Sequence, residues 1–375
     1  MKINIDNYVK EEIDRRKQVF RDLWNGKAMD KVPLDIRVRA EPKYPLREAT
    51  QNADKQLEAA IADVNLTLKN IQHTDTIPGM RPDVGCSCVA SAFGSEYYWG
   101  DNENQTPGIK DHIIHDLEEE IDSLPQPQVT DGWLKEGLKR VAAFAEAGEG
   151  VIPTALLDIA GGVNVASDLI GLNGLLESMY VCPESVHTLL LKIQAFCLDL
   201  IEAQIKAAGG EDNICTTDFV DMWFPEGRKG HVSDDICAMY SPEFYDAFSA
   251  PYHNMIFERY GCGGLHNCGP NPCAENYVSQ KYSPRCIDLS YTYSKDDLPL
   301  LKKHFKKKAF IYLYWDSNME PNPVKWFRDV VDVIQGEILI LPSFALNEQH
   351  DIADIYRKLS EISREYAKKI DWGFC

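Results

Sequence analysis

The densest group of residues able to do chemistry lies between Gly261 and Cys273, where glycine, histidine, asparagine, proline and cysteine alternate. His266 and Cys268 are two residues apart at the end of an expected strand, so both side chains leave the same face. Imidazole nitrogen and thiolate sulfur are ligands of Zn²⁺, and a catalytic zinc site keeps one position open. The segment therefore predicts either a zinc site or a tight Gly/Pro turn that packs its thiols.

Three aspartates stand at corresponding places further along the expected strands. Asp158 follows the third strand, Asp218 follows the fourth and Asp288 lies on the sixth. A carboxylate in such a position can act as a general base or orient a ligand. A helix cap or a solvated loop is the alternative for each of them. We interpret all three as candidate catalytic residues.

Five further residues are candidates for contacts with a cofactor or substrate. Arg37 and Arg39 leave the first strand and could bind a carboxylate bidentately, although a surface salt bridge is the alternative. Trp223 and His231 belong to a stretch that could form a pocket wall. Tyr98 lies in a long early loop, where aromatic side chains could serve as a lid or anchor the loop to the core.

The elements that must position these residues are read from the periodicity of apolar side chains. Eight short extended segments, most of them separated by helical stretches, are expected at residues 32–38, 76–80, 151–157, 214–218, 264–267, 286–290, 309–314 and 337–341. Alternation of this kind implies parallel strands with helical crossovers. We therefore predict one (β/α)₈ barrel domain over residues 1–375, with an N-terminal helical segment and a long insertion after the second strand. An open doubly wound sheet is disfavoured, because no glycine-rich phosphate loop joins a first strand to a first helix.

The composition limits the class of protein further. The 375 residues are 44% hydrophobic and 26% charged, which is typical of a globular enzyme. A formal charge of −19 excludes a broad electrostatic interaction with nucleic acid or an anionic membrane, so a small-molecule substrate is expected.

The eleven cysteines show no framework spacing and the chain opens without a signal-like segment, so we expect a cytoplasmic protein with reduced thiols. A homodimer is the assembly favoured by base rate alone.

Several short motifs occur in an order that matches a known family. They are Lys31–Leu34, Phe93–Glu96, Ala160–Gly162, Leu169–Gly171, Pro183–His187, Ala203–Ile205, Ser233–Asp235 and Leu265–Gly269. With these motifs the chain resembles the uroporphyrinogen decarboxylase superfamily, which includes the methylcobamide:coenzyme M methyltransferases. The resemblance is spread over most of the chain and implies a (β/α)₈ barrel, in agreement with the strand count.

The methyltransferase branch is the closer match in motif. The resemblance implies that His266 and Cys268 supply two zinc ligands, and that zinc holds a thiol as the thiolate that attacks a methyl group on a cobalamin. It implies a corrinoid, carried on a corrinoid protein, as cosubstrate, with a thiol or pterin as acceptor. The branch places its third ligand, a cysteine, after the last strand, where this chain has Ser343. The residues considered as substitutes are Cys273, Cys286, Asp288, Glu348 and His350.

Two alternatives remain open at this stage. One is a metal-independent decarboxylase acting on a polycarboxylate, in which aspartates and arginines at the barrel mouth stabilise a charged intermediate. The resemblance to that branch is weaker, because Asp75 and Asp83 are only loose counterparts of its catalytic aspartate. The other is a binding protein that kept the barrel and lost the chemistry.

Overall fold

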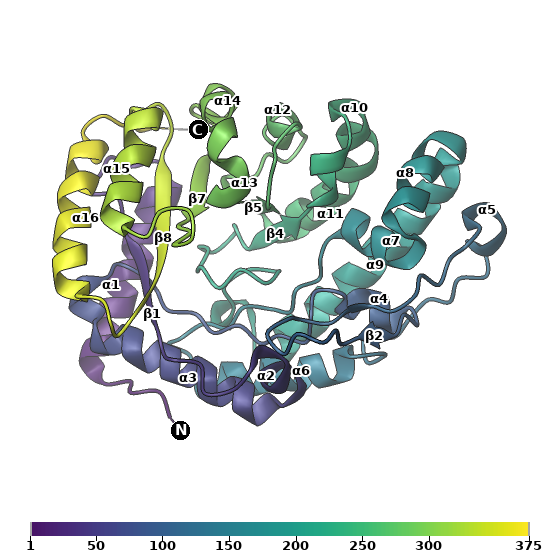
Figure 1. Cartoon of the computed structure of the whole chain (residues 1–375), viewed down its shortest axis with the longest axis horizontal. Coiled ribbons are helices and arrows are strands. Elements are labelled where there is room, and N and C mark those ends of the chain that lie inside the picture. The colour runs from purple at the N-terminus through teal and green to yellow at the C-terminus, as the bar shows by residue number, and fades with distance from the viewer. Residues whose placement is uncertain (1, 374–375) are drawn as a thin grey trace.

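The strands that carry the candidate site form one parallel sheet. In the computed structural model, which describes residues 2–373, six strands are ordered β1-β8-β7-β6-β5-β4 (Figure 1). Their bounds are β1 Asp35–Arg39, β4 Gly230–Ser233, β5 Cys262–Asn267, β6 Cys286–Ser290, β7 Phe310–Tyr314 and β8 Ile340–Asn347. The α/β barrel architecture expected from the sequence is confirmed.

Between β1 and β4 in the chain, the structure has isolated β-bridges instead of a regular ladder of hydrogen bonds. Isolated parallel bridges join Met80 to Thr154 and Thr154 to Ile214. The expected strands at 76–80, 151–157 and 214–218 are therefore not regular strands, which corrects the sequence prediction. Pro78 and Pro153 give a physical reason for two of them, because proline cannot donate to a ladder.

A further correction concerns β4, which the sequence analysis did not count as a strand. Its four residues lack the apolar run that reveals the other strands, yet all of them are buried. β4 pairs with β5 in parallel, with Ser233 opposite His266. This pairing places the residues that follow β4 beside those that follow β5.

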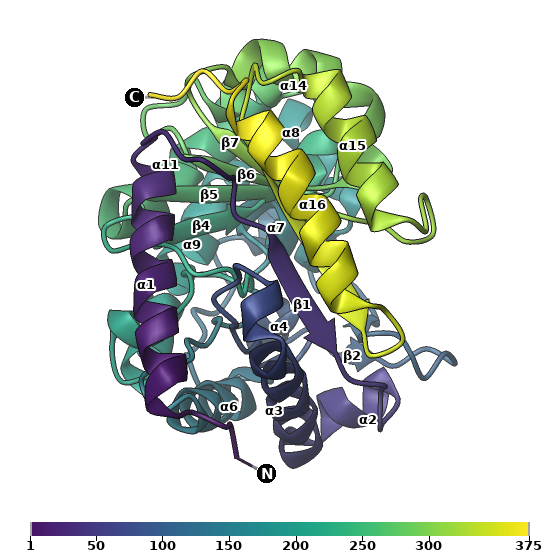
Figure 2. The same cartoon turned by 90° about the vertical axis from the view of Figure 1, so that its left-hand side faces the viewer.

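Helices surround the strands, as Figures 1 and 2 show. Their bounds are α1 Asn7–Trp24, α2 Leu46–Gln51, α3 Ala53–Lys69, α4 Cys88–Ala92, α5 Leu117–Glu120, α6 Leu134–Ala147, α7 Gly162–Ile170, α8 Leu172–Val181, α9 Pro183–Ala207, α10 Pro242–Phe244, α11 Ala250–Tyr260, α12 Ala274–Tyr277, α13 Tyr291–Ser294, α14 Leu298–Phe305, α15 Pro323–Ile334 and α16 Ile352–Ala367. Asp6 begins α1 by accepting a hydrogen bond from the Val9 amide at 2.8 Å. In the described chain we find no helix with the length and apolar character that a membrane crossing requires.

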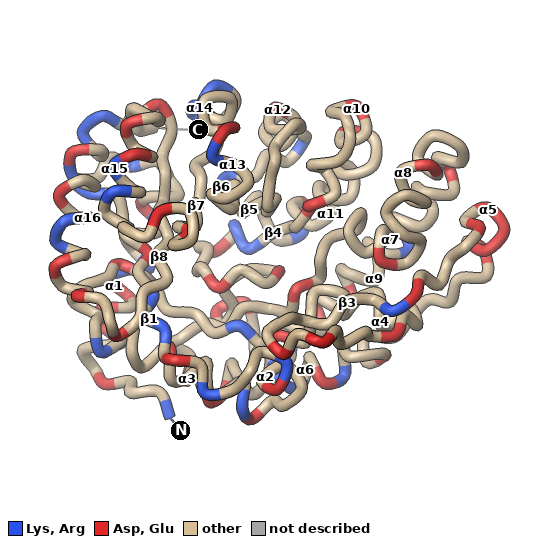
Figure 3. The backbone as a smooth tube through the Cα atoms, in the orientation of Figure 1, with Lys and Arg blue, Asp and Glu red and all other residues tan. Residues whose placement is uncertain are grey.

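The N-terminal helix and the insertion after the second extended segment pack against the barrel. Trp24, at the end of α1, is 1% exposed and its ring centroid lies 4.5 Å from that of Phe224 and 5.1 Å from that of Phe310. The insertion contains α4, α5 and a small antiparallel pair, β2 (Tyr97–Tyr98) and β3 (Gly108–Ile109). Figure 3 shows acidic and basic residues interspersed along the outer helices α15 and α16.

Gly161 connects α7 to the end of β4 by a close backbone approach. It has φ 67°, and a Cβ atom there would overlap the carbonyl oxygen of Ser233. Gly227 has a similar φ of 70°, but a Cβ atom there would meet no atom within 4 Å. A side chain at Gly227 would therefore meet only the backbone strain of a positive φ, whereas a side chain at Gly161 would meet that strain and a steric clash as well.

We expect Gly161→Ala to lower the free energy of unfolding by about 2–5 kcal/mol, because overpacking adds to the strain of a positive φ. Gly227→Ala should lower it by only about 1–2 kcal/mol. Urea unfolding followed by circular dichroism measures both. Equal losses in the two variants would show that Gly161 makes no steric contact of this kind.

Candidate active site

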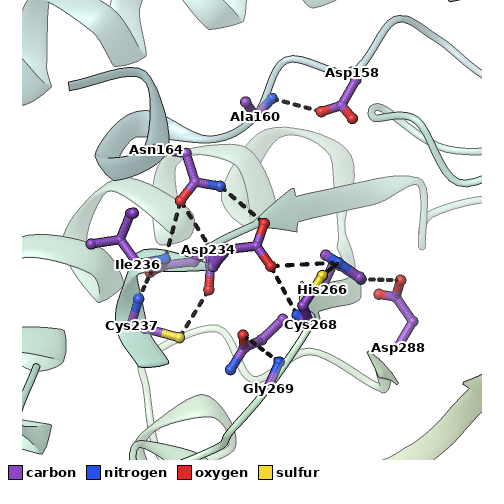
Figure 4. A network of polar contacts seen from close by, with 12 residues as sticks. Asp158, Ala160, Asn164, Asp234, Ile236, Cys237, His266, Cys268, Gly269 and Asp288 are labelled. Atoms are coloured by element: carbon purple, nitrogen blue, oxygen red, sulfur yellow. Dashed lines mark hydrogen bonds and ion pairs between the residues drawn. The ribbon is translucent and has the colours of Figure 1, made fainter. Parts of the chain in front are cut away.

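Three side chains of different chemistry meet where β4 and β5 end. The Cys268 sulfur lies 3.4 Å from Nε2 of His266, and Oδ1 of Asp235 lies 3.7 Å from the same nitrogen. One donor atom from each of the three residues lies within 4.8 Å of the other two. Figure 4 shows His266 and Cys268 side by side, with Asp288 on the other side of the imidazole. We call these three residues, Asp235, His266 and Cys268, the donor cluster.

The backbone explains why Asp235 joins the cluster. Because β4 and β5 are paired, the amide of Cys268 reaches Oδ1 of Asp235 and donates to it at 2.8 Å. Asn164 of α7 accepts hydrogen bonds from the amides of Asp235 at 3.1 Å and Ile236 at 3.2 Å. These contacts hold the turn after β4 against the end of β5.

Asp288 on β6 orients the histidine of the cluster. Its Oδ2 lies 2.8 Å from Nδ1 of His266, so the imidazole turns Nε2 toward Cys268 and Asp235. Its Oδ1 lies 2.9 Å from Nε2 of His231, and the Tyr314 hydroxyl donates to Oδ2 at 3.3 Å. Asp288 is 0% exposed, so one buried carboxylate serves two imidazoles.

The charges of this group shift the pKa values of all three partners. Burial opposes ionisation of Asp288, but the His266 and His231 imidazoles outweigh it and hold its pKa well below its usual range. Burial likewise opposes protonation of His231, but Asp288 and Asp218 raise its pKa to about 9. The pKa of His266 is also raised well above its ordinary value, against the effect of burial, chiefly by Asp288.

A cavity of about 340 Å³ opens beside the donor cluster. Its lining residues are Cys86, Ser87, Asp158, Ala160, Asn164, Ser167, Asp168, Phe219, Ser233, Asp235, Ile236, His266 and Cys268. The cavity is large enough for a small substrate and brings it against the donor atoms.

Asp158 lies on the wall of this cavity, as a catalytic role would require. Its Oδ2 is 3.1 Å from the Arg81 guanidinium, and its Oδ1 accepts from the amide of Ala160 at 3.1 Å. Burial and the neighbouring Asp218 raise the pKa of Asp158 to about 7, although Arg81 opposes the shift.

Asp218 and His231 do not line the cavity but lie behind its wall. Oδ1 of Asp218 accepts from the amides of Ile159 at 3.0 Å and Phe219 at 2.9 Å, which ties together the ends of the extended segments 151–157 and 214–218. Nδ1 of His231 lies 3.6 Å from Oδ2 of Asp218, and neither atom has a hydrogen-bond partner. The sequence placed His231 in a pocket wall, whereas its side chain is 0% exposed and bonded to Asp288.

Arg37 and Arg39 lie outside this cavity and already face carboxylates. Arg37 forms buried ion pairs with Asp35, at 3.1 Å, and with Asp221. Arg39 pairs with Asp63 at 3.0 Å. Both arginines line a separate cavity of about 360 Å³ on the side of β1 and α3. The structure thus places them in a different cavity from the one beside the donor cluster.

Trp223 and Tyr98 are also distant from the donor cluster. Trp223 is 2% exposed, and the charged ends of Lys17 and Arg21 lie over its ring at 5.8 and 5.3 Å. Tyr98 is 55% exposed, whereas its neighbour Tyr97 stacks on Trp133 with a centroid distance of 5.3 Å. Alternation along β2 explains the outward side chain of Tyr98. Neither residue lines the cavity beside the cluster.

The substitutes considered for a third ligand are placed elsewhere. Ser343 donates to Asp35 at 3.0 Å and accepts from Tyr312 at 3.1 Å, within a separate polar network. The thiol of Cys273 is buried 3.5 Å from the carbonyl oxygen of Cys237, and Cys286 is buried at the start of β6. The carboxylate of Glu348 lies 3.8 Å from Nζ of Lys69, and Nδ1 of His350 lies 2.7 Å from Oδ1 of Asn347. Asp288 touches the cluster only through Nδ1 of His266. Asp235, which sequence reasoning noted only as part of a polar motif, is the third residue whose donor atom lies near those of His266 and Cys268.

Comparison with known proteins agrees with this fold. The family model described as uroporphyrinogen decarboxylase (URO-D) matches residues 20–293. The solved structure of a methyltransferase from Methanosarcina mazei superposes with a TM-score of 0.66 at 16% identity, covering 95% of this chain and 98% of that chain. At this identity the likeness shows the fold alone. Among curated proteins none matches the sequence.

The raised pKa of Asp158 predicts a pH dependence of stability. Folded protein keeps the carboxyl proton up to a pH of about 7, whereas the unfolded chain releases it near the ordinary value of 3.8. Stability from this group is present at low pH and is lost as pH rises toward 7. The free energy of unfolding of wild type should therefore fall, relative to that of Asp158→Asn, between pH 4.5 and pH 6.5, about the range between the two pKa values.

Urea titrations at several pH values in this window measure the difference. The matched control is Asp332→Asn, because Asp332 is exposed on α15. A constant difference between wild type and Asp158→Asn across the window would contradict the raised pKa.

Proposed function

The chain belongs to the uroporphyrinogen decarboxylase family, and we propose that it is a methyltransferase that moves a methyl group between a corrinoid and a thiol or pterin acceptor. The observation that carries this proposal is the donor cluster of Asp235, His266 and Cys268 beside a cavity of about 340 Å³. The fold shared with a methyltransferase supports it. A corrinoid protein is the expected carrier of the methyl group.

The donor cluster fits zinc in both chemistry and spacing. Its donors are one nitrogen, one sulfur and one oxygen, all of which bind Zn²⁺. Tetrahedral zinc bonds of about 2.0–2.3 Å place neighbouring ligand atoms roughly 3.3–3.8 Å apart. The separations from Nε2 of His266, 3.4 Å to sulfur and 3.7 Å to oxygen, lie in this range. Three protein ligands leave the fourth position of a catalytic site for substrate.

Zinc bound by these residues would stabilise the thiolate form of an acceptor near neutral pH. The chain's own residues prepare that chemistry. Asp288 accepts from Nδ1 of His266 and so leaves Nε2 free to bind, which is the usual second contact of a metal-binding histidine. The backbone amide of Cys268 fixes the rotamer of Asp235.

Asp158 is the group in the cavity wall best suited to move a proton. Its pKa of about 7 lies near neutral pH, where a carboxyl group can both give and accept a proton. It lines the same cavity as the donor cluster, so a substrate bound there can reach both. We assign Asp158 the role of taking the proton released when the acceptor thiol ionises.

The decarboxylase alternative has weaker support in this arrangement. It needs arginines free to bind several substrate carboxylates, but Arg37 is paired with Asp35 and Asp221, and Arg39 with Asp63. The binding-protein alternative rested on the absence of a third cysteine. Asp235 supplies a third donor of suitable chemistry, which removes that support.

Metal analysis tests the ligand set directly. We expect the purified, untagged protein to hold close to one zinc per chain, and Cys268→Ser and Asp235→Asn to lose most of it, because each removes one of three donors. The control is Cys262→Ser, since Cys262 stands on the same strand but outside the cluster. Full zinc in Cys268→Ser would show that the ion binds elsewhere.

Activity is tested with free methylcobalamin and a panel of small thiols and reduced pterins, by the change in corrinoid absorbance on demethylation. We expect turnover by the zinc-loaded wild type. The turnover rate of Asp235→Asn should be lower by about 100-fold or more, because loss of a zinc ligand removes the activation of the acceptor nucleophile. Zinc-loaded protein that releases CO₂ from a polycarboxylate, and demethylates no corrinoid, would replace this proposal with the decarboxylase alternative.

A further inference from the structure

His231 is a fully buried polar residue that touches neither the cavity nor the donor cluster. It lies on β4 and is 0% exposed, and its Nε2 lies 2.9 Å from Oδ1 of Asp288. Burying an imidazole next to two carboxylates has a large desolvation cost unless the contacts offset it. The contact with Asp288 offsets part of that cost.

The surrounding strands are shaped to admit the ring. A Cβ atom at Gly264 on β5 would lie 2.7 Å from the imidazole of His231 and 2.9 Å from the ring of Phe224. Phe219 and Phe224 each present their rings at a steep angle to the imidazole, with centroids 5.8 Å away. Glycine at 264 thus leaves the space that lets His231 reach Asp288 between two aromatic walls.

We propose that His231 is a positioning residue for the metal site: by donating to Oδ1 of Asp288, it directs Oδ2 onto Nδ1 of His266 and so aims Nε2 of His266 at the other donors. This inference rests on the proposed function, because it assumes that the donor cluster binds metal. It assigns a role to a residue two contacts away from the donor atoms.

The geometry explains why the second imidazole matters. A carboxylate held at one oxygen only can rotate about its Cβ–Cγ bond, and its free oxygen would be buried without a partner. With His231 on Oδ1 and His266 on Oδ2, both oxygens of Asp288 are fixed. The tautomer and ring angle of His266 are then fixed as well, and both determine how well its Nε2 binds a metal.

Two substitutions of similar polarity separate positioning from simple burial. The amide nitrogen of His231→Gln can reach the place of Nε2 and keep the donation to Asp288, whereas the shorter His231→Asn cannot. We expect His231→Asn to weaken zinc binding about tenfold, the lower end of the loss typical for outer contacts of a metal site. We expect His231→Gln to bind zinc nearly as well as wild type.

The measurement is a competition titration of metal-free protein with zinc and a coloured chelator, repeated with Co²⁺, whose visible spectrum reports the coordination geometry. We expect the cobalt spectrum to change in His231→Asn and to be retained in His231→Gln. The control is Tyr312→Phe, which removes a buried hydroxyl from the barrel interior but leaves the contacts of Asp288 intact. Tyr312→Phe should bind zinc as wild type does.

The outcomes distinguish failure of the positioning role from failure of the proposed function. Unchanged zinc affinity in His231→Asn, or an equal loss in the Gln and Asn variants, overturns the positioning role while the proposed function stands. A wild type that binds neither zinc nor cobalt overturns the proposed function and this inference together. If His231→Asn fails to fold, His231→Ala is titrated with added imidazole, which should restore zinc affinity, and no recovery overturns the inference.

Discussion

The site depends on one buried carboxylate. Asp288 is 0% exposed, and a charge so far from water is tolerated only when its partners offset the desolvation. His231, Asp288 and His266 come from the adjacent strands β4, β6 and β5, so the sheet itself brings the three side chains together. If the carboxylate were absent, Nε2 of His231 and Nδ1 of His266 would both lose their partner. The direction of His266, and with it the donor cluster, follows from this contact.

A second buried polar network lies elsewhere in the barrel. Barrel interiors are commonly filled by layers of branched apolar side chains. Here Asp35, Arg37, Tyr312 and Ser343 form a second buried network on the side of β1, β7 and β8. Arg37 offers its one positive charge to two carboxylates, Asp35 and Asp221. The barrel thus holds two buried polar networks, and the one at β4, β5 and β6 presents donor atoms to a cavity.

The sequence was informative wherever the signal was local. Strands β6 and β7 are apolar and buried, and their periodicity located them. His266 and Cys268 share a face because of strand alternation, which the sequence alone predicts. The pairing of Arg37 with Asp35 also had a local signal, because residues two apart on a strand lie on one face.

What could not be predicted depends on the register between strands. Asp235 meets Cys268 only because β4 pairs with β5, and β4 has no apolar pattern to reveal it. The bond between Asp288 and His231 likewise joins residues 57 positions apart. Tyr98 and Trp223 were chosen for their residue type, but the exposure of the one and the burial of the other follow from how the insertion and α1 pack.

Because Asp235, and not a residue of the last strand, completes the donor cluster, its three members lie close together in the sequence. All its members, together with Asp288 and His231, lie between residues 231 and 288. During synthesis these residues leave the ribosome before β7 and β8 do, since chains emerge from the N-terminus. The donor atoms can therefore approach one another while the last quarter of the barrel is still being translated.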